Sequence, residues 1–171
     1  MKQGWTTPSE ENYLEWIYRL SAEGPVRPAV IAGKLGVKRP SATKAVASLA
    51  RKGLVRHEPY GEIFLTEEGR TLGEAIVRRD TCLTKLLVGV LGMPPAEADP
   101  EVHRMEHVLS DEVLARLEVL VDFAGSSEAW IKRLRYRIAL ATAGAKEGGP
   151  IRVGRSPIHP GTEGEKEVGD T

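Results

Sequence analysis

The pattern at positions 26–65 limits the fold of this chain more than any other stretch. A short apolar helix is expected over 26–35, a glycine-containing turn follows it, and a second helix is expected over 40–52. Two β runs, 54–56 and 63–65, then flank a Glu-Pro-Tyr-Gly-Glu turn that is typical of a hairpin. Helix, turn, helix and hairpin in this order predict a winged helix-turn-helix.

Further helices are expected on both sides of this unit. The sequence Thr-Pro-Ser-Glu at 7–10 has the composition of a capped helix start, and this helix should run to about residue 20. After the hairpin, a long helix is expected over 66–91, a central helix over about 100–123 and a last helix from 126 onward. The fold class is therefore mainly α with a small β-hairpin.

This reading divides the chain into three parts. Residues 1–70 are expected to form the winged helix-turn-helix, residues 71–143 an α-helical domain and residues 144–171 a disordered tail, because few large apolar residues occur there. A single cysteine, Cys82, argues against a disulfide framework. No signal-peptide pattern and no bilayer-length apolar run is visible, so we expect a cytoplasmic protein with no membrane association.

The formal net charge of zero conceals a strong segregation of charge. From Arg27 to Arg56 there are eight basic residues and no acidic ones, whereas acidic residues dominate from Glu97 to Asp122. Ordinary solvated surfaces mix both signs, so the basic segment indicates a polyanion, and double-stranded DNA fits the predicted fold. Hydroxyls and cations early in the second helix suit a major groove. The candidate DNA-contacting residues are Lys38, Arg39, Pro40, Ser41, Thr43, Lys44 and, in the wing, Tyr60.

A His-x-x-Glu-His sequence is the second signal in the chain. Helical positions three and four apart share a face, so His103, Glu106 and His107 should project together. Two imidazoles and a carboxylate are ligand types that divalent transition metals take. Taken alone, such a motif is about as often a solvated polar face as a site. The acidic segment around it and the basic winged helix favour a metal site.

Four stretches of the chain resemble the metal-dependent repressors of the diphtheria toxin repressor and manganese transport regulator type. They are TPSEENYLE at 7–15, IAGKL and SATK within 31–44, LTEEG at 65–69 and MEHVLSDEV at 105–113, of which the last is the most specific. The resemblance covers about residues 7–140. It implies a homodimer whose winged helix binds DNA and whose C-terminal helices form a dimerisation and metal-binding domain. The length resembles the short form without an SH3-like domain.

The resemblance also implies a set of metal ligands. These are Asn12, Glu15, Asp80, His103, Glu106 and His107. Asn12, Asp80 and His103 depart from the usual family residues, whereas Glu106 and His107 match. The oxygen-rich set with two imidazoles and no thiolate suits Mn(II) or Fe(II) first, with Co(II) or Zn(II) as alternatives. Because an imidazole bridges two metals less readily than a carboxylate does, we expect one tight metal per subunit and any second site to be weaker. The tight metal is expected at the three residues of the His-x-x-Glu-His sequence together with one or more of Glu15, Asp80 and Asn12.

Three functions are compatible with these features. The preferred one is a metal-responsive transcriptional repressor, not an enzyme, with a divalent metal as co-repressor. A metal-independent winged-helix regulator with a degenerate site is the first alternative. A zinc hydrolase in which Glu106 acts as general base is the second. In each regulator the dimer interface is expected from apolar residues after Asp80, which are Leu83, Leu86, Leu87, Val90, Leu91, Leu109, Val113 and Leu117.

Overall fold

The computed structural model describes residues 6–58 and 61–143. Two expectations, the wing contact of Tyr60 and the disordered tail at 144–171, lie outside these residues. The elements in chain order are α1 (Pro8–Ser21), α2 (Pro28–Leu35), α3 (Arg39–Arg51), β1 (Val55–His57), β2 (Ile63–Leu65), α4 (Glu67–Thr84), the π-helical turn η1 (Lys85–Val90), α5 (Pro95–Glu106), α6 (Asp111–Gly125) and α7 (Glu128–Ala143).

The N-terminal half forms the predicted winged helix-turn-helix. Gly36 adopts a left-handed conformation (φ 63°) between α2 and α3, which a side chain would disfavour. The hairpin pairs β1 antiparallel to β2, with Val55 opposite Leu65. Apolar side chains from α1, α2, α3 and the hairpin share one core, whose fully buried members include Leu14, Ile17, Ile31, Val46, Leu49 and Leu54. The expected fold class is confirmed.

The start of α1 confirms the predicted capping box. The Thr7 hydroxyl accepts a hydrogen bond from the Glu10 backbone N–H at 3.3 Å, and the Thr7 backbone N–H donates to the Glu10 carboxylate at 2.8 Å. This pairing satisfies two N–H groups that an uncapped helix end would leave without partners. The capping box therefore fixes the residue at which α1 begins.

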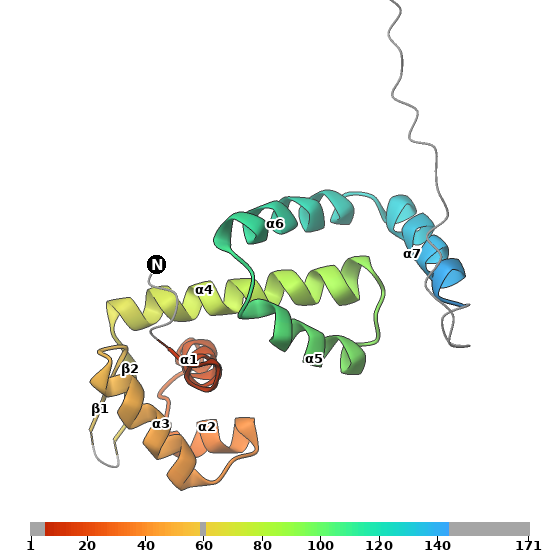
Figure 1. Ribbon diagram of the computed structural model, residues 1–171. Coiled ribbons are helices and arrows are strands. Elements are labelled where there is room, and N and C mark those ends of the chain that lie inside the picture. The colour runs from red at the N-terminus through yellow and green to blue at the C-terminus, as the bar shows by residue number, and fades with distance from the viewer. Residues whose placement is uncertain (1–5, 59–60, 144–171) are drawn as a thin grey trace, which may run out of the picture.

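Helix α4 connects the two halves of the molecule. Figure 1 shows α1 packed across its N-terminal part and α5 and α6 lying along its C-terminal part. The approach of α1 to α4 depends on Gly73, because a Cβ atom there would lie 2.8 Å from Cβ of Tyr18. The expected boundary between residues 70 and 71 falls in the first turn of this continuous helix.

Two predicted helices are interrupted in the structure. The helix expected over 66–91 changes to a π-helical turn at Lys85. The central helix expected over 100–123 is two helices, because α5 ends at Glu106 and the extended backbone of Ser110 (ψ 154°) starts α6, where its hydroxyl accepts from the Val113 backbone N–H. The His-x-x-Glu-His sequence therefore lies at the end of α5, within reach of α1, and not in the middle of a long helix.

The expected dimer residues include four that are already buried inside the single chain. Leu83, Leu86, Leu87 and Val90 are each at most 8 % exposed, because they pack against α5, α6 and α7. The expectation that these four side chains face a partner is wrong, since apolar density alone does not distinguish a chain's own core from an interface. Most exposed large apolar side chains of this half lie instead on α6 and α7, and Val108 lies in the turn before α6.

Candidate metal centre and DNA-binding surface

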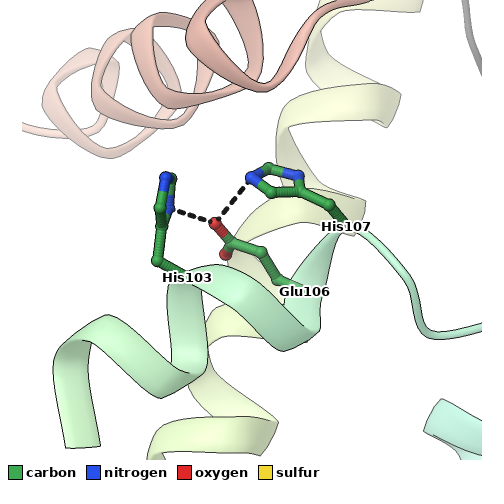
Figure 2. A group of neighbouring side chains, drawn as sticks. All are labelled: His103, Glu106 and His107. Carbon is green, nitrogen blue, oxygen red and sulfur yellow. Dashed lines mark hydrogen bonds and ion pairs between the residues drawn. The ribbon is translucent and has the colours of Figure 1, made fainter.

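The three residues of the His-x-x-Glu-His sequence converge at the C-terminal end of α5. One potential ligand atom from each of His103, Glu106 and His107 lies within 4.8 Å of the other two. Nδ1 of His103 is 2.8 Å from Oε1 of Glu106, and Nε2 of His107 is 3.3 Å from the same oxygen. Figure 2 shows the imidazoles on either side of the carboxylate, with α1 running close by. The convergence follows from the helical spacing of three and four residues.

Burial makes the Glu106 carboxylate the centre of this group. Its side chain is 9 % exposed, against 19 % for His107 and 55 % for His103. Burial raises the pKa of Glu106 above its ordinary value, His107 and His103 act in the opposite direction, and the negative charge of Glu15 raises the pKa further. An ionised Glu106 is therefore stabilised by any cation placed beside it.

A residue outside the expected ligand set orients His107. Oε2 of Glu11, on α1, lies 2.9 Å from Nδ1 of His107. When Glu11 is ionised it only accepts hydrogen bonds, so Nδ1 carries the proton and Nε2 of a neutral imidazole carries a lone pair. Within the described residues, this buried Nε2 has no hydrogen-bond partner. A carboxylate that fixes a histidine tautomer through its other nitrogen is the usual support of a metal ligand.

These observations fit a divalent metal. The lone pair of His107 Nε2 faces an oxygen of Glu106 across 3.3 Å, so two electron-rich atoms oppose each other in a buried place. A cation between them satisfies both atoms, whereas a hydrogen bond would require one of them to be protonated. His103 adds a third potential ligand atom on the more exposed side. Imidazole nitrogen and carboxylate oxygen are ordinary ligands for Mn(II), Fe(II), Co(II) and Zn(II).

The remaining expected ligands lie on the neighbouring helices. Asn12 is half-buried on α1, one residue after Glu11. Glu15 and Asp80 both contact Arg19, whose Nε is 2.8 Å from Glu15 Oε1 and whose Nη2 is 2.5 Å from Asp80 Oδ2. The structure thus brings Glu11 into contact with His107 of the α5 group. Glu15 and Asp80 instead form ion pairs with the guanidinium of Arg19.

Helix α3 presents the expected DNA-contacting residues to solvent. Its inward positions Ala42, Val46 and Leu49 are buried, and the opposite face is exposed. The exposed candidates are Lys38, Arg39, Pro40, Ser41, Thr43 and Lys44. Two other basic residues of this half are paired across the fold, since Arg27 contacts Glu62 and Lys52 contacts Glu10. The cations at the start of α3 therefore form a basic surface of the kind that contacts phosphates.

The fold and this centre together define a class of proteins, in which a winged helix-turn-helix is joined to a helical metal-binding unit. Residues 5–63 match the family model for the iron dependent repressor, N-terminal DNA binding domain. Residues 66–128 match the model for the iron dependent repressor, metal binding and dimerisation domain. The chain belongs to the iron-dependent repressor family, whose members are transcriptional repressors and not enzymes.

Similar proteins come from several organisms. The chain is 39 % identical over 114 residues to the diphtheria toxin repressor of Corynebacterium glutamicum, which covers 66 % of this chain and 50 % of that protein. It is 40 % identical over 109 residues to the iron-dependent repressor IdeR of Mycobacterium tuberculosis, covering 63 % and 47 %. An uncharacterised helix-turn-helix transcriptional regulator of Methanocaldococcus jannaschii is 35 % identical over 116 residues, covering 67 % and 93 %. The chain thus spans about half the length of the two named repressors.

Solved structures show the same arrangement. The manganese regulator SloR superposes with a TM-score of 0.60 at 28 % identity, covering 69 % of this chain and 55 % of that one. A manganese-dependent transcriptional repressor in complex with manganese gives a TM-score of 0.57 at 32 % identity, covering 67 % and 53 %. None of the described helices combines the length and the apolar composition that a membrane span requires.

Proposed function

We propose that this protein is a metal-responsive DNA-binding repressor in which a divalent metal acts as co-repressor. The observation that carries the proposal is the juxtaposition of the His103–Glu106–His107 group on α5 with Glu11 on α1. Helix α1 belongs to the winged unit, so the centre joins the DNA-binding half to the helical half. As a regulator of metal homeostasis genes, the protein acts in the cytoplasm.

Helix α1 also contacts α3, the proposed recognition helix, through polar groups. The Glu10 carboxylate accepts hydrogen bonds from Ser48 Oγ at 2.8 Å and Lys52 Nζ at 2.6 Å, at the end of α3. Glu10 and Glu11 are consecutive, so α1 holds α3 on one side and His107 on the other. A change in the position of α1 relative to α5 therefore moves α3. This coupling is how an event at the centre reaches the DNA-binding surface.

Each residue of the centre has a role in binding a divalent ion. His103, Glu106 and His107 would hold the ion, and Glu11 would keep Nε2 of His107 available to it. When bound, a divalent ion supplies the positive charge that favours the ionised form of Glu106. Metal binding shifts the equilibrium between two arrangements of α1 and α5. The shift is limited by how much more tightly the metal binds one arrangement than the other. We propose Mn(II) or Fe(II) as the physiological ion, because the group contains imidazole and carboxylate ligands without a thiolate.

A homodimer is the proposed working form, because two recognition helices must lie one groove repeat apart to bind a two-fold operator. The exposed apolar face of α6 and α7 is the proposed interface. Val113 and Leu120 are seven residues apart on α6 and Phe123 follows three residues later, so the three side chains lie toward one face of the helix. The Phe123 ring contacts Trp130 of α7 edge to face, with ring centroids 6.4 Å apart. Exposed aromatic and aliphatic side chains in one patch are typical of an interface.

A DNA-binding titration tests this proposal. The full chain is stripped of metal with EDTA, and its affinity for operator fragments selected from genomic DNA is measured by gel shift with and without Mn(II), Fe(II), Co(II) or Zn(II). We expect affinity to rise at least tenfold with the correct ion, and Glu106→Gln to abolish that rise. Affinity that no ion changes would instead support the metal-independent regulator. Zinc-dependent peptide hydrolysis lost in the same variant would support the hydrolase.

A further inference from the structure

A single guanidinium joins α1 to α4 beside the metal centre. Nε of Arg19 donates to Glu15 Oε1 at 2.8 Å, one turn earlier on α1, and Nη2 donates to Asp80 Oδ2 at 2.5 Å, on α4. The Glu15 and Asp80 side chains are only 15 % and 29 % exposed. Two partly buried carboxylates from two helices therefore point at one position, and the positive charge of Arg19 occupies it.

The Arg19 guanidinium and the proposed metal centre are connected by residues on one face of α1. Glu11, Glu15 and Arg19 are spaced by four residues, so they lie along one face of α1. Glu11 contacts His107 at one end of this face and Arg19 contacts Asp80 at the other. Between them, Glu15 is close enough to Glu106 for its negative charge to act on that carboxyl. The guanidinium is thus linked to the proposed metal centre through Glu15.

We propose that Arg19 is a built-in cation which keeps Glu15 and Asp80 from coordinating metal and so restricts each subunit to one divalent ion, held by His103, Glu106 and His107. The inference rests on the proposed function for the identity of that ion. A guanidinium stays charged at every physiological pH, so it remains the shared counter-charge of both carboxylates whatever the metal supply. Its removal leaves two converging carboxylates without a counter-charge, which is a set of oxygen ligands for a hard divalent cation.

Arg19 would also separate two functions of α1. The contact from Arg19 to Asp80 holds α1 against α4 without metal, whereas the contacts from α1 to α5 run through Glu11 and His107. Metal supply then affects only the second set of contacts. Arg19 is accordingly a residue that determines metal stoichiometry, although it is not itself a ligand.

The proposed role of Arg19 is tested by the number of Mn(II) ions bound per subunit. Electron paramagnetic resonance measures the free Mn(II), and the bound amount is the difference from the total. The full chain is titrated as wild type and as Arg19→Met, Arg19→Lys and Arg78→Met. The last variant removes an arginine that bridges α4 to Glu118 on α6, away from the centre, and is the matched control. We expect Arg19→Met to bind one Mn(II) per subunit more than the wild type, and the other two variants to bind the same number as the wild type. Equal numbers in Arg19→Met and the wild type would overturn the proposal.

Asp80→Asn provides a second measurement that leaves Arg19 in place, so it also covers a failure of Arg19→Met to fold. We expect its Mn(II) dissociation constant to stay within about threefold of the wild type, whereas Glu106→Gln should raise it by about a hundredfold, the upper range for loss of a metal-supporting group. A rise of tenfold or more in Asp80→Asn places Asp80 among the ligands and overturns the assignment. A wild type that binds no Mn(II) counts against metal at the centre, while the difference between Arg19→Met and wild type still decides the role of Arg19.

Discussion

Oε2 of Glu11 and Nδ1 of His107 lie 2.9 Å apart, although 96 residues separate them in the chain. This contact joins the first helix of the winged unit to the last residues of α5. It sets the tautomer of His107 and directs the other ring nitrogen at Glu106. The same two side chains therefore belong to the proposed metal centre and connect the halves of the molecule.

The first prediction concerns Glu11 as the support of His107. Glu11→Gln removes the negative acceptor for the Nδ1 proton, so we expect Mn(II) affinity to fall by about 10- to 100-fold, the range for loss of such a partner. Competition with a fluorescent chelator measures the change. Glu23→Gln, an exposed position after the end of α1, is the control and should leave affinity unchanged. Equal affinities in both variants would show that Glu11 does not act on the metal.

The second prediction concerns the connection from α1 to α3. Although burial disfavours the ionised carboxyl, hydrogen bonds from Lys52, Thr7 and Ser48 lower the pKa of Glu10 to about 2. A carboxyl with a lowered folded-state pKa adds stability above its unfolded value, near 4.5, and that stability is lost as pH falls toward 2. Glu10→Gln should therefore lower the free energy of unfolding at pH 7 by about 1–2 kcal/mol.

Urea unfolding at pH 7, 4.5 and 3 checks this dependence. The difference between wild type and Glu10→Gln should shrink steadily from the first pH to the last. Glu112→Gln is the control, because Glu112 pairs with Arg116 on the exposed surface of one helix and such pairs add little. A difference for Glu10→Gln that is independent of pH would mean that the charge of Glu10 does not stabilise the fold.

The third prediction concerns the basic surface at the start of α3. Arg39→Ala and Lys44→Ala should each weaken operator binding. If Lys44 contacts a phosphate, its loss should also lower the slope of log affinity against log salt by about one. Fluorescence anisotropy at several salt concentrations gives both quantities. Lys132→Ala, on the exposed side of α7, should change neither. Unaltered binding in both α3 variants would place the DNA contact on another element.

The fourth prediction concerns the proposed dimer interface. Phe123 is 64 % exposed in the single chain, so Phe123→Glu should leave the fold intact and break the association of two copies by burying a charge. Light scattering at micromolar concentration should then report a monomer. Phe64→Glu, an equally drastic change at an exposed position on β2, should remain dimeric. A dimeric Phe123→Glu protein would exclude this face.

Local sequence was enough for features that depend on residues within four positions of one another. The capping box of Thr7 and Glu10 and the common face of His103, Glu106 and His107 both follow from helical spacing, which any helix imposes. Glu11, Glu15 and Arg19 also share a helix face by their spacing of four residues. What those residues contact depends on how α1 lies against α4 and α5.

Tertiary packing decided the remaining features. The contact of Arg19 with Asp80 spans 61 residues, and no local rule distinguishes it from contact of Asp80 with a metal. Leu83 and Leu86 had the apolar density of an interface, and only the positions of α5, α6 and α7 showed that the chain covers them itself. The sequence alone thus determined most of the helices, the hairpin and the residue types suited to a metal, but not the interruptions at Lys85 and after Glu106. The pairing of charges and the division between core and exposed apolar face required the packed structure, because they depend on distances between elements remote in sequence.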